Sequence, residues 1–337
     1  MLMVNVDQAE ALGRLLAPVR DRISVDTFTD TRYYPPPSAS KRDVAMYFLV
    51  MVAMDHRLSR PGRPYEGVVD GERYHGADLL YRLGMKKYTE DPGFFEASRL
   101  ARVRERDVVR WLSASDGRGG MVSPPDPRVR AELLRDLGRK LEALYGGDPF
   151  ALIAESRGML RRGVGDGFID RLKVFKAYQD PVEKKAFLLA KFLERRHVLE
   201  VADHYNKEVP VDNHLVRIAV RTGIVGLSRP MIEKMARFVP FTVWEDVSLR
   251  LAARQAYRIV SQASGIDPFI LDDFLWMFGR RCCTRENPTC RASCRSGCNA
   301  IGGCNGGGSC IFSPVCRAYR NPLLMVPEHT FLETWWY

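Results

Sequence analysis

Cysteine is absent from the first 281 residues, and all eight cysteines of this 337-residue chain lie between positions 282 and 316. This distribution excludes a disulfide framework that spans the fold. The sequence also lacks a basic leader followed by an apolar core and a small-residue cleavage site, so secretion is not expected. The predicted location is therefore cytoplasmic. Disulfide frameworks are typical of small secreted domains, which makes metal binding the better interpretation of these cysteines.

Long apolar runs are missing as well. The longest uncharged apolar stretch, Val44–Met54, is far too short to cross a bilayer. We therefore expect it to form a buried helix and expect no membrane partner. The content of 46% hydrophobic and 27% charged residues is typical of an ordered globular protein, which we expect to be monomeric.

Acidic residues are scarce where the cysteines lie. The chain has a formal net charge of +10, and residues 276–320 contain seven arginines and one glutamate. An excess of positive charge favours a polyanionic partner, because contacts with phosphates release counterions. The same arginines can also offset the charge of thiolates bound to a metal. We predict that Arg280, Arg281 and Arg317 contact nucleic acid.

Most of the sequence has the periodicity of helices. Apolar residues recur at helical intervals before Gly146-Gly147, and similar patterns cover 42–54, 101–112 and 77–83, the last with Gly84 as a C-terminal cap. The exception is Tyr65–Tyr74, where Asp70-Gly71 predicts a short hairpin. We therefore predict an all-α fold with one N-terminal β-hairpin. The predicted divisions are a helical section at 1–125, a core at 126–276, a cysteine loop at 277–320 and an aromatic tail at 321–337, which we expect to dock onto the fold.

Two cysteine pairs have spacings typical of metal ligation. Cys283 and Cys290 are separated by six residues, and Cys310 and Cys316 by five. Thiolates grouped in this way bind an iron–sulfur cluster, or a zinc ion in a site with four cysteine ligands. No Cys-x2-Cys knuckle of the usual zinc type is present, so the spacing favours a cluster. The remaining four cysteines can be spare ligands, a second metal site or a redox element: Cys282, Cys294, Cys298 and Cys304.

Two polar residues stand at predicted helix starts. Lys184 opens a helix with one buried face, and a positive charge in the first turn is disfavoured by the helix dipole. A lysine whose charge is disfavoured is easier to deprotonate and is then a better nucleophile. Asp212 precedes a second helix that ends at Gly223, and the simplest role for this aspartate is an N-cap. Lys185 is the rival of Lys184.

The ordered combination of these features resembles a known family. It comprises Lys184-x-Ala186, then Val209-Pro210-Val211-Asp212-x-His214-x-x-Arg217, then the two cysteine pairs. The pattern is similar to that of the helix–hairpin–helix base-excision DNA glycosylases of the endonuclease III type, over about residues 170–320. The resemblance implies a two-lobed helical fold with a C-terminal iron–sulfur loop. It also implies Lys184 as nucleophile, Asp212 as the assisting carboxylate, and a [4Fe–4S] cluster on Cys283, Cys290, Cys310 and Cys316.

The chain departs from the family pattern in the hairpin, in the spacing of the middle cysteines, and in the 28-residue gap from Lys184 to Asp212, which is longer than in endonuclease III itself. Asp180-Pro181-Val182 stands where the family has Gly-Val-Gly, and nineteen residues separate Cys290 from Cys310, where the family has two. The archaeal 8-oxoguanine glycosylases, a divergent branch of the superfamily, also lack the usual hairpin.

The resemblance implies a DNA repair N-glycosylase and AP lyase that acts on damaged double-stranded DNA through a lysine Schiff base. RNA remains open as a substrate. Two other functions are compatible with the sequence: a non-catalytic iron–sulfur nucleic-acid-binding protein, and an N-glycosidic enzyme acting on RNA or a nucleoside.

Overall fold

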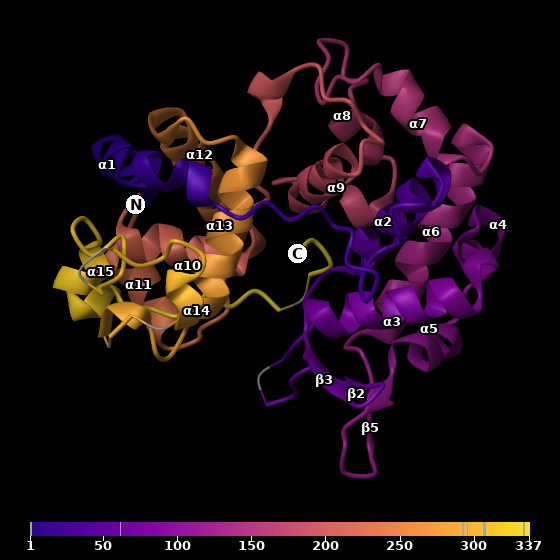
Figure 1. The fold of residues 1–337 in the computed structure, drawn as a ribbon, viewed down its shortest axis with the longest axis horizontal. Helices are drawn as coiled ribbons and strands as arrows, with labels where there is room; N and C mark the ends of the chain where they lie inside the picture. Colours follow the sequence, from indigo (N-terminus) through magenta and orange to yellow (C-terminus); the bar gives the residue numbers. More distant parts are fainter. Residues whose placement is uncertain (1, 61, 292, 295, 306–307, 333) are drawn as a thin grey trace. The chain divides into compact units, whose positions relative to one another are not determined.

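The computed structural model describes residues 2–60, 62–291, 293–294, 296–305, 308–332 and 334–337. The fold is mostly helical with a small amount of antiparallel sheet, as expected (Figure 1). The chain forms two compact units, Met1–Asp26 with Lys207–Leu332 and Thr27–Asn206 with Glu333–Tyr337. In the described part of the chain, no helix is long and apolar enough to cross a membrane.

The first unit combines the N-terminal residues with the last third of the chain. Its helix α1 packs on α12, where a side chain at Gly13 would collide with Ala263 (Figure 1). Strand β1 pairs antiparallel with β6, in the register Leu2 with Leu227. The elements of this unit are β1 (Leu2–Val4), α1 (Val6–Leu16), η1 (Ala17–Arg22), α10 (Asn213–Thr222), β6 (Val225–Leu227), α11 (Arg229–Ala236), α12 (Val243–Ser264), α13 (Pro268–Arg281), η5 (Thr289–Arg291), α14 (Ser296–Asn299), α15 (Arg317–Arg320) and η6 (Pro322–Leu324).

The second unit is built around α2 (Lys41–Met54), in which every residue from Val44 to Met54 is buried, as predicted. Helices α3, α6, α7 and α9 contact it. The other elements are β2 (Glu66–Val69), β3 (Glu72–His75), α3 (Ala77–Glu90), η2 (Pro92–Phe95), α4 (Ala97–Leu100), α5 (Glu105–Leu112), β4 (Ala114–Ser115), β5 (Met121–Val122), α6 (Pro127–Tyr145), α7 (Pro149–Ser156), α8 (Phe168–Leu172), η3 (Lys176–Tyr178), α9 (Lys184–Arg195) and η4 (His204–Asn206).

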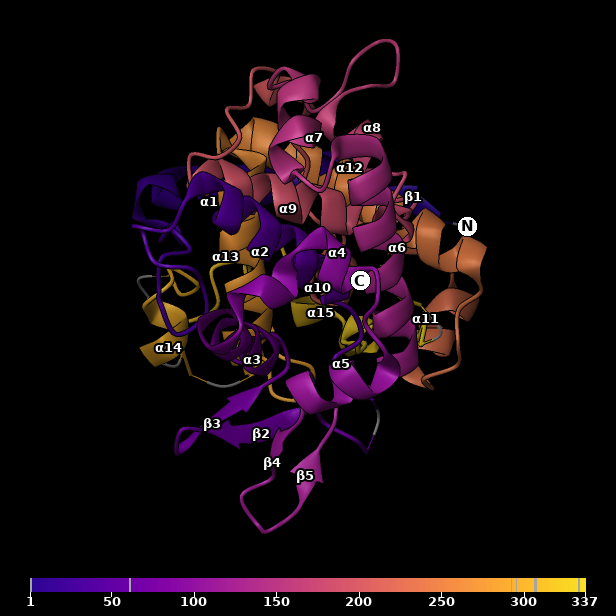
Figure 2. The same ribbon diagram turned by 90° about the vertical axis from the view of Figure 1, so that its right-hand side faces the viewer.

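The predicted hairpin is present as β2 and β3, which turn at Asp70 and Gly71, both with positive φ. Positive φ at both central residues is the requirement of the tight turn that Asp-Gly favours. The sheet is larger than expected, because β4 and β5 extend it to the order β3-β2-β4-β5 (Figure 2). These two strands lie in a segment rich in glycine and proline.

Two helix boundaries in the second unit differ from prediction. Gly84 does not end a helix, because α3 continues to Glu90, and a side chain at Gly84 would collide with Met51 of α2. The glycine is therefore needed for close helix packing. The pattern over 101–112 predicts one helix across that range, whereas the observed helix α5 begins only at Glu105, after the extended residue Arg104.

The compact units also differ from the predicted divisions. The boundaries fall near residues 26, 206 and 332 rather than at 125, 276 and 320. The N-terminal section divides because α1 packs on α12 while α2 belongs to the second unit. The end of the aromatic tail docks as expected within the second unit, where Trp335 Nε1 donates to the Lys176 carbonyl at 3.1 Å and the Arg57 guanidinium lies over the Tyr337 ring.

Candidate functional site

Asp212 is the N-cap of α10, as predicted. Its Oδ1 accepts a hydrogen bond from the backbone N–H of Leu215 at 3.0 Å. The helix ends at Gly223, whose φ of 85° is the left-handed value expected of a terminal glycine. The carboxylate is half-buried. The sequence Val211-Asp212 therefore fixes one acidic group at the start of a buried helix.

Two buried arginines on α10 hold the cysteine segment. Arg217 donates to the carbonyls of Cys283 at 2.9 Å and Gly279 at 2.6 Å. Arg221 donates to the carbonyls of Thr284 at 2.7 Å, Arg285 at 2.8 Å and Val326 at 2.8 Å. Burial lowers the pKa of Arg217 to about 10, against the opposite influence of the Cys283 thiol. The helix that begins after Asp212 therefore also fixes the backbone next to Cys283.

The four cysteines assigned from the family pattern line one small cavity in the first unit. Cys283, Cys290, Cys310 and Cys316 are all free thiols, and the cavity between them has a volume of about 20 Å³. The Cys316 thiol also donates to the Arg221 carbonyl at 3.3 Å. The remaining lining is mostly apolar: Phe278, Phe312, Pro288 and Met325, with Arg221, Thr222 and Cys282.

Burial makes three of these thiols poor acids in the absence of a cation. It raises the pKa of Cys310 to about 12 and that of Cys316 to about 11, and it also raises the pKa of Cys290. Buried thiols without a metal are inert, whereas a metal ion deprotonates them outright. Four convergent thiols in an apolar cage therefore fit the donor set of a thiolate-bound metal centre.

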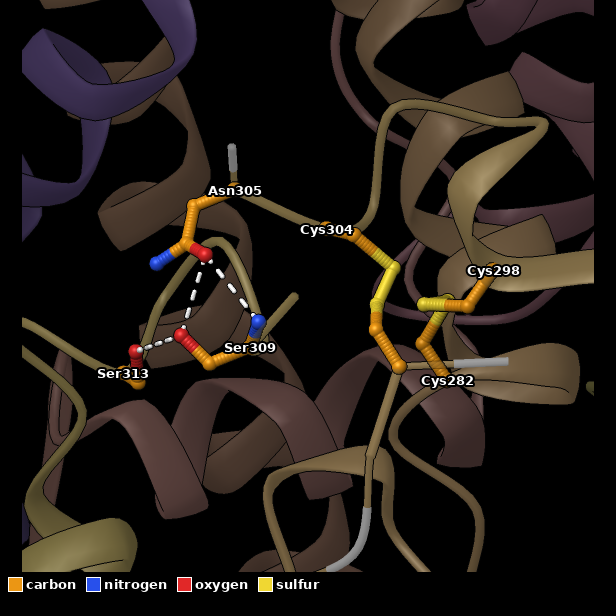
Figure 3. The surroundings of a disulfide bond; sticks show 7 residues. Cys282, Cys298, Cys304, Asn305, Ser309 and Ser313 are labelled. Carbon is orange, nitrogen blue, oxygen red and sulfur yellow. Dashed lines mark hydrogen bonds between the residues drawn. A yellow bond between two sulfur atoms is a disulfide. The ribbon is translucent and has the colours of Figure 1, made fainter. Parts of the chain in front are cut away.

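The surplus cysteines lie close together in the same segment. Sulfur–sulfur bonds join Cys282 to Cys298 and Cys294 to Cys304 (Figure 3). The sulfur atoms of Cys294, Cys298 and Cys304 all lie within 4.8 Å of one another, a grouping that can hold a metal ion. The C-terminal segment therefore contains two groups of cysteines: four free thiols around a cavity and a second group whose sulfur atoms lie close enough to hold a metal ion.

No protein-family profile matches this chain, and no curated protein is significantly similar to it. The family resemblance therefore remains a hypothesis that depends on the lysine, aspartate and cysteine pattern.

Lys184 is the first residue of α9, in the second unit. The Asp180 carboxylate accepts the backbone N–H groups of Val182 at 3.0 Å and Lys184 at 2.9 Å, so this turn caps the helix without glycines. The ammonium of Lys184 pairs with Asp55 Oδ2 at 3.4 Å, and its side chain is 10% exposed. Lys184 is thus a nearly buried lysine held by one carboxylate. Asp55 was not identified from the sequence, since nothing near it marks an ion pair with α9.

Lys185 is the more deeply buried of the two lysines. It has no exposed surface, and its Nζ donates to the Ala53 carbonyl at 2.6 Å and lies 3.2 Å from His56 Nδ1. Burial, together with the charge of Lys184, moves the pKa of Lys185 well below its ordinary value. From the sequence, the helix dipole was expected to disfavour the charge of Lys184. In the structure, burial disfavours the charge of Lys185 and lowers its pKa. The expectation of one buried face was wrong, because every residue from Lys184 to Leu193 is buried.

The predicted nucleic-acid-binding arginines lie on the first unit. Arg281 and Arg317 are exposed, and Arg280 is partly buried with its guanidinium over the Trp276 ring at 4.4 Å. Arg280 and Arg281 are the last two residues of α13, and Arg317 is the first residue of α15.

Glu328 is a residue of this region that sequence reasoning missed. It is buried, forms an ion pair with Arg217, and pairs with Arg285 at 2.7 Å. Its neighbours in the sequence give no signal of this role, because its partners lie far away in the chain.

Proposed function

We propose that this chain is a DNA repair N-glycosylase and AP lyase with a helix–hairpin–helix glycosylase-like fold. One observation carries the proposal: α10 starts at the candidate catalytic residue Asp212, and its buried arginines bind the backbone beside Cys283. Two separate parts of the family pattern are thereby joined in one structural element. The four free thiols around a common cavity supply the third part.

Lys184 is the proposed nucleophile. Its neutral amine attacks the anomeric carbon of the damaged nucleotide, the bond from that carbon to the base breaks, and the base leaves with a proton. The resulting Schiff base permits strand cleavage by elimination. The Asp55 carboxylate, 3.4 Å from Nζ, orients the lysine and is the nearest described group that can accept its proton.

Asp212 is the proposed electrostatic partner. A carboxylate near the sugar ring stabilises the positive charge that develops as the base departs. As an N-cap, the aspartate is held by the Leu215 N–H, so its position does not depend on substrate.

A [4Fe–4S] cluster fits the four free cysteines of the cavity, and it would cross-link the loop that follows α13. The proposed base-excision reaction needs no redox step from the cluster. The exposed Arg281 and Arg317 on that segment, together with the formal charge of +10, support a nucleic-acid substrate. We propose damaged double-stranded DNA.

One observation favours the alternative of a binding protein that has lost catalysis. The Nζ of Lys184 forms an ion pair with Asp55 at 3.4 Å, and this contact must break before the nitrogen can attack carbon.

Covalent trapping separates the two functions. The purified chain is incubated with a panel of lesion-containing duplexes and borohydride, which reduces a Schiff base to a stable bond. We expect a covalent protein–DNA product that Lys184→Ala abolishes and Lys185→Ala retains. Binding to lesions without base release would instead show a non-catalytic protein. Trapping that is lost only in Lys185→Ala would move the nucleophile by one residue.

A further inference from the structure

The four cysteines outside the proposed cluster gather at one point. Cys282 ends α13, Cys298 lies in α14, and Cys294 and Cys304 lie in the flanking loops. Cys282 is bonded to Cys298, and the sulfur of Cys298 is within 4.8 Å of both Cys294 and Cys304 (Figure 3). All four sulfur atoms are therefore in one small volume, although the residues span 23 positions of the sequence.

We propose that Cys282, Cys294, Cys298 and Cys304 bind one zinc ion as four thiolates in the reduced protein. A tetrahedral zinc site has Zn–S distances of about 2.3 Å, which places its sulfur atoms about 3.8 Å apart. The sulfur atoms of Cys294, Cys298 and Cys304, all within 4.8 Å of one another, have separations similar to these. Thiols this close also form disulfides when oxidised. Reduction of the two bonds takes four electrons and four protons from a dithiol reductant, and zinc then displaces the thiol protons.

Gly303 lies directly against two of these sulfur atoms. A side chain at Gly303 would place its Cβ 2.7 Å from the sulfur of Cys282 and 2.7 Å from that of Cys298. The Gly303 N–H donates to the Cys298 carbonyl at 2.9 Å, and its carbonyl accepts from Ile311 N–H at 3.0 Å. Cys282 and Cys298 are almost completely buried, with exposures of 1% and 0%. Only glycine leaves room for two sulfurs at this position.

The two cysteine groups differ in a way that favours a single ion here. The thiols of Cys283, Cys290, Cys310 and Cys316 surround a cavity and none is bonded to another. A four-iron cluster puts iron and sulfide atoms between its thiolates, so its ligands must stand apart. In the second group the sulfurs of Cys294, Cys298 and Cys304 lie within 4.8 Å of one another, a spacing closer to that around a single ion.

The proposed zinc site adjoins the proposed cluster site without sharing a ligand. Cys282 precedes Cys283, and the backbones of Cys304 and Cys310 form an antiparallel bridge. Among the described residues of the intervening segment, the helical elements are the short η5 and α14. Segments too small for a hydrophobic core are commonly held by a structural metal. The zinc ion would therefore hold the loop that presents Cys290 and Cys310. This inference does not depend on the enzymatic proposal.

The test is a metal analysis of the full chain purified anaerobically with a dithiol reductant. We expect one zinc ion per chain in addition to iron. Cys298→Ser and Cys304→Ser should lose zinc and keep iron, whereas Cys316→Ser should lose iron and keep zinc. Gly303→Ala should lower zinc occupancy. Gly297→Ala is the matched control, because a Cβ there meets nothing within 4 Å.

X-ray absorption at the zinc edge of the wild type provides a measurement that does not require the variants to fold. Four sulfur neighbours at about 2.3 Å are expected. Three outcomes would overturn the proposal: nitrogen or oxygen neighbours of zinc, iron in excess of one four-iron cluster with no zinc, or persistence of the two disulfides in the reduced protein.

Discussion

The guanidinium of Arg221 lies 3.5 Å from the sulfur of Cys283, and the Arg221 carbonyl accepts the thiol of Cys316 at 3.3 Å. A single residue of α10 therefore contacts two of the four cysteines around the cavity. Because the same helix begins after Asp212, the cysteine-lined cavity and the candidate catalytic carboxylate are both held by α10.

Arg221→Met should weaken metal retention without removing any ligand. The methionine keeps much of the packing volume but loses four described hydrogen bonds to backbone and sulfur. Loss of a group that orients metal ligands typically costs about 10- to 100-fold in affinity. Iron content after gel filtration measures the effect. Arg229→Met is the control, since the Arg229 side chain is 90% exposed on α11. Equal iron in both variants would contradict the supporting role of Arg221.

The purified protein should be brown, oxygen-sensitive and contain iron and inorganic sulfide in equal amounts. Cys283→Ser and Cys316→Ser should lose the colour, because each removes a ligand of the cavity. Cys298→Ser should keep it. Absorption spectra and iron analysis of anaerobic samples decide the matter. A wild-type protein that holds zinc and no iron would eliminate the cluster.

Asp212→Asn should fold normally and lose base release. Asparagine caps a helix as well as aspartate does, so the thermal midpoint of unfolding should change little. Removal of the charge should slow base release by about 10²- to 10³-fold. Single-turnover assays on the lesion identified by trapping give the rate. If the variant is fully active, Asp212 serves only as a cap.

Binding to duplex DNA should weaken steeply as salt increases. Arg280→Ala and Arg281→Ala should each reduce the slope of log affinity against log salt by about 1, without changing the preference for a lesion. Fluorescence anisotropy between low and physiological salt measures both quantities. The exposed Arg229 again serves as the control. An affinity that does not depend on salt would argue against a nucleic-acid partner.

The second unit should lose stability in mild acid because of His56. Burial and the charges of Arg130, Lys185, Lys184 and Arg60 move the pKa of His56 well below its ordinary value of 6.5. Below pH 6.5 the unfolded chain takes up a proton that the folded protein does not, so the free energy of unfolding falls as pH falls. The loss between pH 7.5 and 5.5 should be on the order of 1 kcal/mol.

Urea titrations at the two pH values test this contribution. His56→Gln should show a smaller difference between them, whatever its absolute stability. His75→Gln is the matched control because His75 is exposed on β3. A pH dependence in His56→Gln equal to that of the wild type would assign the acid sensitivity to other groups.

Local signals in the sequence correctly predicted local structure. Asp70-Gly71 forms the predicted turn, Asp212 caps α10, and Gly223 ends it. These features depend on backbone conformation and on hydrogen bonds a few residues apart, which the sequence encodes directly. The spacing of four cysteines likewise identified residues that line a common cavity.

Features set by distant parts of the chain were not predictable. Gly84 resembles a helix end, yet it is a packing contact with Met51. The low pKa of Lys185 arises from its burial beside Ala53 and His56, which are more than 100 positions away in the sequence. The pairing of α1 with α12 likewise overrides the composition change that suggested a boundary near residue 125.

The interleaving of the two units has a consequence for biosynthesis. The second unit uses the nearly continuous stretch Thr27–Asn206, while the first needs both Met1–Asp26 and Lys207–Leu332. During translation the second unit can therefore fold while α1 still lacks its partner α12. The apolar face of α1 stays without α12 until the ribosome has made that helix, and the cysteines emerge later still. Binding of the proposed metal ions would therefore come late in the maturation of the first unit.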